Sequence, residues 1–138
     1  MFGKTQSFDD SVLPPELVGD GDSNAREQIE KLFTPLHVSA GRTLIEAGHF
    51  GREFFVITAG RAVVLRDGDE VGQLGAGDFC GEIALLEGER RNATVRALTD
   101  MKVLVANPRE FRALLGASPR FAAAIQAMSS ARRLALAS

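Results

Sequence analysis

The residues best suited to chemistry lie in one short stretch, Gly81 to Leu86, and in Arg91, which follows shortly after it. A glycine lets the backbone approach a ligand closely, and the N–H groups that open a short helix point toward an anion. Arg91 adds a planar fork of donors that suits a phosphate. Glu82 would repel a phosphate, but an ionised carboxylate accepts hydrogen bonds and therefore suits the hydroxyls of a sugar. The segment thus predicts a site for a nucleotide monophosphate.

A plain alternative for the same stretch is a surface helix that carries several glutamates and happens to precede two arginines. Gly-Glu-x-Ala-Leu is a weak motif when it stands alone. Other chemistry has less support. Cys80 falls in an expected strand with no base nearby in the sequence, and no Ser/His/Asp arrangement stands out. His37 and His49 have no cysteine cluster to join, so we predict neither a catalytic site nor a metal site.

Size and composition favour a single domain with its own core. The chain has 138 residues, of which 45% are hydrophobic and 25% charged, as in ordinary globular proteins. Its one cysteine excludes an intrachain disulfide and fits a reducing compartment, so we expect a cytoplasmic location. A net charge of −2 gives no overall attraction to nucleic acid, and the apolar runs are too short to span a bilayer.

The chain divides into a leader and a domain. Residues 1–23 are rich in Asp, Gly, Ser and Pro without sustained periodicity, which predicts a flexible leader. The domain is expected over residues 24–138. It begins with a helix that Ser23 or Asn24 would cap and that Pro35 would end.

Short apolar runs separated by glycine turns predict strands from about residue 36 to 107. The two strands around Asp67-Gly68 form the clearest hairpin, because this dipeptide suits a two-residue turn. Many short strands at close spacing indicate an antiparallel β-roll of the jelly-roll, or double-stranded β-helix, type. The eight expected strands are 36–38, 43–46, 54–58, 62–66, 71–74, 78–80, 93–97 and 102–106.

Helical character returns after Pro108, which suits a first helical position. Gly116 is expected to stop this helix, and a second helix is expected from about Pro119. Its apolar stripe contains Phe121 and Ile125, and continues toward the C-terminus. The predicted fold class is therefore α+β, a β-roll flanked by N-terminal and C-terminal helices.

Two stretches of the chain resemble the cyclic nucleotide-binding domain family, and the resemblance covers about residues 24–138. This family includes catabolite-activator-type regulators, regulatory subunits of cyclic nucleotide-dependent kinases and cyclic nucleotide-gated channels. The first stretch, Leu44-Ile45-Glu46-Ala47-Gly48 with Gly51, Phe54-Phe55-Val56-Ile57 and Gly60, is similar to the early strand-turn-strand signature. The second, Gly81 to Leu86 with Arg91, resembles the phosphate-binding cassette.

The resemblance implies a role for each cassette residue. Glu82 would accept from the ribose 2′-hydroxyl, Arg91 would pair with the cyclic phosphate, and Gly81 and Ala84 would offer backbone groups. Asn92 stands where the family has Ala, Ser, Thr or Gln, and it leaves the choice between cAMP and cGMP open. The implied ligand-binding set is Gly81, Glu82, Ile83, Ala84, Arg91, Asn92 and Ala93.

The family also covers the base with an apolar group from its last helix. Ile125, Met128 and Leu134 are the candidates, although an aliphatic stripe at helical spacing more often serves plain packing. Because a charged site residue serves the ligand more than the core, we expect Arg91→Ala to weaken binding with little loss of folding.

The sequence hypothesis is a cyclic nucleotide sensor and not an enzyme, with cAMP or cGMP as ligand and no cofactor. Movement of the C-terminal helix would be its output. It would act through a protein effector, or would be a piece of a longer protein that holds the effector domain. Whether the C-terminal helix forms a homodimer is left open. The alternative is a roll that binds no nucleotide and serves as an interaction or dimerisation module.

Overall fold

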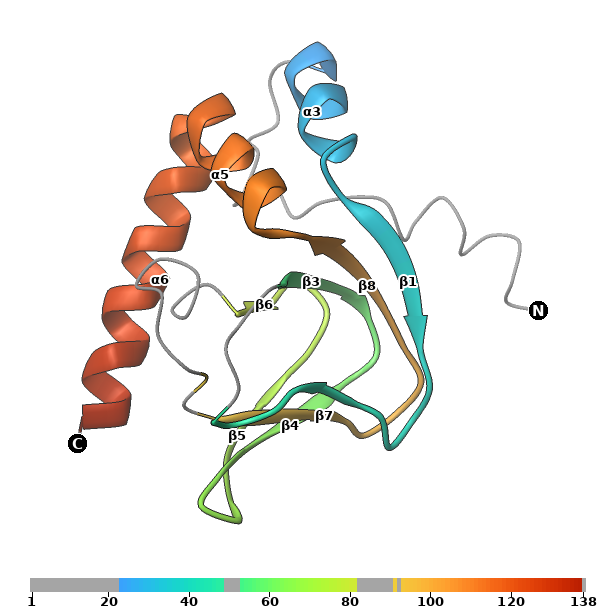
Figure 1. Ribbon diagram of the computed structural model, residues 1–138, viewed down its shortest axis with the longest axis vertical. Helices are drawn as coiled ribbons and strands as arrows, with labels where there is room; N and C mark the ends of the chain where they lie inside the picture. Colours follow the sequence, from blue (N-terminus) through green and yellow to red (C-terminus); the bar gives the residue numbers. More distant parts are fainter. Residues whose placement is uncertain (1–22, 49–52, 82–90, 92, 138) are drawn as a thin grey trace.

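The computed structural model describes residues 23–48, 53–81, 91 and 93–137 of the chain. Two four-stranded antiparallel sheets face each other, with helices beside the first of them (Figure 1). The strand order is β1-β8-β3-β6 in the first sheet and β2-β7-β4-β5 in the second. The elements are α3 (Ser23–Glu30), β1 (Thr34–Val38), β2 (Thr43–Ile45), β3 (Phe54–Ala59), β4 (Ala62–Arg66), β5 (Asp69–Leu74), β6 (Phe79–Cys80), β7 (Thr94–Ala97), β8 (Met101–Ala106), α5 (Pro108–Ala117) and α6 (Pro119–Ala137).

This architecture confirms the predicted α+β roll, and all eight expected strands form with ends that differ by at most two residues. The hairpin between β4 and β5 turns at Asp67 and Gly68, whose φ angles are 54° and 86°. Positive φ at both central residues is the geometry of a type I′ turn, which matches the right-handed twist of the flanking strands. The Asp-Gly signal in the sequence therefore located this turn correctly.

The central strands of the first sheet, β3 and β8, are largely buried on both faces, because their alternate residues enter two different cores. In β8, Leu104 and Ala106 belong to the core beneath the helices, whereas Met101 and Val103 belong to the core between the two sheets. Side chains alternate across a strand, so one apolar strand can serve both cores. The sheet thus connects the interior of the roll to the helices.

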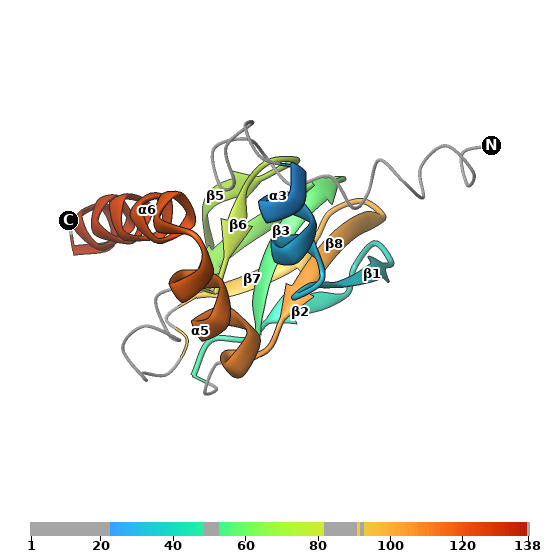
Figure 2. The ribbon, with the colours of Figure 1, turned by 90° about the horizontal axis from the view of Figure 1, so that it is seen from above.

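An aromatic cluster joins β3 to the helical layer. Phe54 is fully buried, and its ring centroid lies 4.9 Å from that of Phe111 in α5 and 5.8 Å from that of Phe121 in α6. It also contacts Phe79 of β6 at 5.6 Å and Phe33 at 6.3 Å. Tilted and edge-on pairs at these separations are favourable geometries for aromatic rings. Seen from above, α6 extends beyond the sheets while α3 and α5 lie over them (Figure 2).

The helix boundaries correct two predictions. Helix α5 begins at Pro108, capped by Asn107 in a capping box with Glu110, as the proline signal indicated. Gly116, however, lies inside α5, and the helix ends one residue later with Ser118 as its C-cap. Pro35 does not end the first helix but lies in β1, an edge strand, where a missing N–H is tolerated. No helix in the described part of the chain has both the length and the apolar character needed to cross a membrane.

Candidate functional site

Gly81 follows directly after β6 and adopts φ +98°, a backbone conformation that residues with a side chain rarely take. A Cβ atom at this position would lie 2.6 Å from the carbonyl oxygen of Glu53 and 2.9 Å from Nη1 of Arg91. The glycine is therefore required twice, once by its backbone conformation and once by the space that its neighbours occupy. The close approach to a ligand stays a prediction, and the groups that lie close to Gly81 in the structure belong to the protein itself.

The side chain of Arg91 is buried, with 8% of its surface exposed. Its Nη1 donates to the carbonyl oxygen of Gly81 at 3.0 Å, and its Nη2 donates to the carbonyl oxygen of Glu53 at 2.7 Å. The guanidinium thus links the residue after β6 to the residue before β3, two strands that pair in the first sheet. Both acceptors are neutral carbonyls, which orient a guanidinium without removing its charge.

The backbone of Arg91 is held by a second segment. The N–H of Gly48 donates to the carbonyl oxygen of Arg91 at 2.8 Å. One residue earlier, the N–H of Ala47 donates to Oγ1 of Thr94 at 3.0 Å. Ala47, Gly48 and Glu53 all belong to the connection between β2 and β3, so this connection contacts Arg91 at its backbone and at its guanidinium.

The structure brings Gly81 and Arg91 of the predicted site into direct contact and places Ala93 just before β7, partly buried. Glu82, Ile83, Ala84 and Asn92 lie outside the described residues. Their roles therefore stay predictions, as does the choice between cAMP and cGMP that depends on Asn92.

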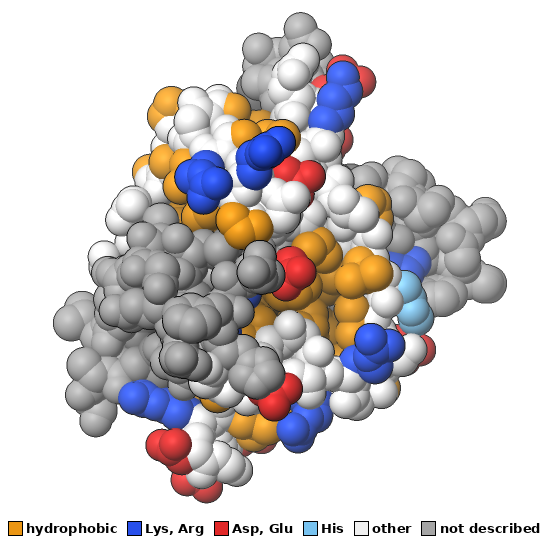
Figure 3. Space-filling model, viewed as in Figure 1, with side chains coloured by type: hydrophobic (Ala, Val, Ile, Leu, Met, Phe, Trp, Pro, Cys, Tyr) orange, Lys and Arg blue, Asp and Glu red, His pale blue; other side chains and the backbone are white. Residues whose placement is uncertain are grey.

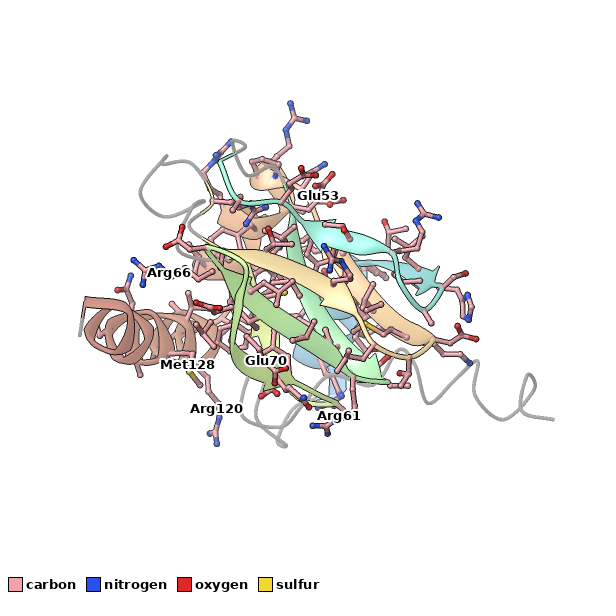
Figure 4. The ribbon with its side chains drawn as sticks, turned by 90° about the horizontal axis from the view of Figure 1, so that it is seen from below. Glu53, Arg61, Arg66, Glu70, Arg120 and Met128 are labelled. Atoms are coloured by element: carbon pink, nitrogen blue, oxygen red, sulfur yellow. The ribbon has the colours of Figure 1, made fainter. Side chains whose placement is uncertain are left out.

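Sequence reasoning missed Glu53, whose contribution to the site is its backbone carbonyl. A carbonyl oxygen belongs to every residue type, so no residue letter could have marked it. Figure 4 shows the exposed Glu53 far from Arg61 and Glu70 of the β4 and β5 side. Gly48 was noticed as part of the early signature, but its contact with the backbone of Arg91 was not.

Burial and backbone contacts argue against the expectation that Arg91→Ala would scarcely affect folding. The substitution removes two partly buried hydrogen bonds, and an intramolecular hydrogen bond contributes roughly 0.5–1.5 kcal/mol to stability. Arg91 therefore supports the local structure as well as the predicted site.

The three candidates for covering the base have different surroundings. Ile125 is fully buried in the core beneath the helices, where it packs rather than faces a ligand. Met128 is 39% exposed, and Figure 4 shows it on α6 together with Arg120. Leu134 belongs to the part of α6 whose side chains the structure does not describe. Among these three, the described and accessible side chain is that of Met128.

The surface shows no concentration of positive charge on the face in Figure 3. The described Lys and Arg side chains are scattered over this face, Asp and Glu lie among them, and apolar side chains occupy the region between the sheets. A nucleic-acid interface requires basic residues gathered on one face. The described residues of this face do not provide one.

Comparison with known proteins gives the family. The model of the cyclic nucleotide-binding domain matches residues 35–118, more than half of the chain. The chain belongs to this family. The matched unit is a binding domain and not a catalytic one, in agreement with the prediction that the chain is not an enzyme.

The relatives include a cAMP-dependent protein kinase regulatory subunit of Yarrowia lipolytica, a cGMP-dependent protein kinase of Drosophila melanogaster and, among solved structures, the catabolite activator protein of Thermus thermophilus.

Three relatives show the range of the family. A cyclic nucleotide-gated potassium channel of Rhizobium etli is 36% identical over 111 residues, which cover 80% of this chain and 31% of the channel. The structure of cAMP-bound PfPKA-R superposes with a TM-score of 0.70 and 27% identity, covering 82% of this chain and 40% of that one. The regulatory subunit of a cAMP-independent protein kinase A from Trypanosoma brucei superposes with a TM-score of 0.63 and 29% identity, covering 70% and 38%. The chain spans about a third of the length of the curated relatives that it matches first.

Proposed function

We propose that this domain binds a 3′,5′-cyclic nucleotide, cAMP or cGMP, and passes the binding signal to its C-terminal helix. Arg91 pairs with the cyclic phosphate, and Glu82 accepts from the ribose hydroxyl. The observation that carries the proposal is the environment of Arg91, a buried guanidinium oriented by the carbonyl oxygens of Gly81 and Glu53.

The orientation of this guanidinium supports anion binding on physical grounds. A guanidinium has five N–H donors in a rigid plane, and bonds from Nη1 and Nη2 to two separate carbonyls fix the direction of that plane. A side chain that is already ordered loses less conformational entropy when a ligand arrives. In a poorly solvated site, its charge also attracts a phosphate more strongly than it would in water.

The route to the helix begins at Glu53. Its carbonyl accepts from Arg91, and the next residue, Phe54, packs against Phe111 of α5 and Phe121 of α6. A ligand that moves or fixes Arg91 would act on β3 and so on the rings that seat both helices. The ligand shifts these helices only as far as its affinities for the two arrangements differ.

The remaining parts of the proposal concern the effector, the residue that covers the base, the location and the oligomeric state. We expect the domain to control a protein effector, either a separate partner or another domain, because its relatives are much longer proteins. Met128 is the residue of α6 that we propose to cover the base. A cytoplasmic location and a homodimer through α6 remain predictions.

The second candidate function is a roll that binds no nucleotide. One observation favours it, because the Trypanosoma brucei neighbour shares this fold and is the regulatory subunit of a protein kinase A described as cAMP-independent. The fold alone therefore does not decide whether cAMP acts on this chain, and a titration must.

Isothermal titration with cAMP and with cGMP tests the proposal, with non-cyclic AMP as the reference ligand. We expect saturable heat with a cyclic nucleotide, and dissociation constants at least about tenfold weaker for Arg91→Lys, since an ammonium cannot reproduce a bidentate fork. Arg96→Lys is the matched control, because Arg96 is an exposed residue of β7. If the unchanged chain shows neither heat nor thermal shift with either nucleotide, the interaction-module function takes its place.

A further inference from the structure

The hydroxyl of Thr94 lies at a junction between the candidate site and the β2–β3 connection. Strand β7 holds Thr94, whose backbone pairs with Leu65 of β4 on one side. On the other side, β2 and β7 pair through Ile45 and Val95 and through Thr43 and Arg96. Two residues after Ile45, a side chain makes the contact with β7, because Oγ1 of Thr94 accepts from the N–H of Ala47.

The next residue after Ala47, Gly48, is hydrogen-bonded to Arg91. The N–H of Gly48 donates to the carbonyl oxygen of Arg91, so the Ala47–Gly48 turn is held at one residue by Thr94 and itself holds the backbone of Arg91 at the next. Gly48 adopts φ +89°, a conformation that glycine takes without strain. The hydroxyl of Thr94 accepts from the residue just before this glycine and so contributes to fixing the turn.

We propose that Thr94 is a positioning residue for the phosphate-binding arginine, acting through the Ala47–Gly48 turn. The hydroxyl fixes the turn, the turn fixes the backbone of Arg91, and the carbonyls of Gly81 and Glu53 fix its guanidinium. The side chain and the backbone of the arginine are thereby held by separate groups. Thr94 makes no contact with the ligand in this scheme, and the inference rests on the proposed function of Arg91.

Thr94→Val removes the hydroxyl while keeping the shape of the side chain and suiting a strand. We expect this change to weaken cyclic nucleotide binding roughly 2- to 10-fold, the effect of losing one ordinary hydrogen bond. Thr94→Ser keeps the hydroxyl and should restore most of the affinity. Thr94→Ala removes the same hydroxyl in a smaller side chain, and it serves as the second test variant if valine impairs folding.

Thr99→Val is the matched control. The hydroxyl of Thr99 also accepts from a backbone N–H, that of Arg61, at 3.1 Å, but it lies between β7 and β8 and outside the site. This variant should lose that bond, together with the bond that the hydroxyl donates to the carbonyl oxygen of Asp100 at 2.9 Å, and should keep its affinity. Thermal melts of all variants separate a loss of folding from a loss of binding.

A double-mutant cycle separates positioning from mere structural support. In an Arg91→Lys background the ammonium is a point charge that needs no fixed plane, so Thr94→Val should change the dissociation constant by less than about twofold. The inference is overturned if Thr94→Val and Thr94→Ala bind as tightly as the unchanged chain, or if their effect persists in full beside Arg91→Lys. If the unchanged chain binds neither cAMP nor cGMP, both the inference and the proposed function fail. Binding by the unchanged chain and by the Thr94 variants alike overturns the inference alone.

Discussion

At the scale of single residues, Arg91 serves the fold and the proposed ligand through the same guanidinium. Burial of a charged group is unfavourable unless other groups solvate it, and the carbonyls of Gly81 and Glu53 contribute to that solvation. The same two bonds orient the side chain that we propose to meet the nucleotide.

Gly81 is the residue on which this arrangement depends most closely. We expect Gly81→Ala to lower the free energy of unfolding by about 1–3 kcal/mol, because alanine is strained at φ +98° and its Cβ would meet the carbonyl of Glu53. The same methyl would displace Nη1 of Arg91, so cyclic nucleotide binding should weaken as well. Urea denaturation and titration with cAMP measure the two effects.

Gly116→Ala is the control for this substitution. Gly116 lies inside α5 with open space around its Cβ position, and alanine there should stabilise the protein by about 0.5–1 kcal/mol. If Gly81→Ala is as stable as Gly116→Ala, the described packing around Gly81 is wrong.

Residue types explain which parts of the candidate site the sequence could predict. Arg91 and Gly81 were found because their chemistry depends on the side chain or on its absence. The contributions of Glu53, Ala47 and Gly48 are main-chain groups, which the fold brings near Arg91 from about 40 positions away. The sequence identifies Thr94 only as a strand residue, because the contact of its hydroxyl with Ala47 depends on the fold.

At the scale of elements, glycine and proline signals succeeded where local geometry decides the outcome. The β4–β5 turn and the start of α5 depend on φ values that Asp67-Gly68 and Pro108 adopt readily. The predictions from Gly116 and Pro35 were wrong because tertiary contacts outweigh local preference. For a glycine inside a helix, the unfavourable propensity relative to alanine is only about 1 kcal/mol. Phe111 and Leu114 bury α5 against the core, and Pro35 occupies an edge strand.

Strand β3 is the element that we propose to couple the site to the helices, and Phe54 is its contact with them. Phe54→Leu removes ring contacts with Phe111 and Phe121, so the free energy of unfolding should fall by about 1–2 kcal/mol. Hydrogen exchange should also show that a cyclic nucleotide protects α5 and α6 less in this variant than in the unchanged chain.

Phe55→Leu provides the comparison, because Phe55 lies in the same strand but faces the core between the sheets. It should destabilise the protein similarly while leaving the ligand-dependent protection of α5 and α6 intact. Equal loss of protection in both variants would remove β3 from the proposed route.

At the scale of the whole molecule, the structure combines a rigid frame with a site at its edge. The central strands of the first sheet, β3 and β8, are held between two cores. The Arg91 guanidinium bridges the adjoining ends of β3 and β6, and α6 extends beyond the roll (Figure 2). Family membership and fold followed from the sequence because strand spacing and the two signatures are local. The route that we propose from the site to the helices did not, because it depends on how distant rings pack.

A crystal structure of the chain grown with saturating cAMP or cGMP would show whether Arg91 holds the cyclic phosphate. We predict a cyclic nucleotide whose phosphate oxygens accept from the guanidinium of Arg91, with the bonds from that guanidinium to Gly81 and Glu53 retained and Glu82 at the ribose. A nucleotide bound elsewhere, or at this site without contact to Arg91, would contradict the account.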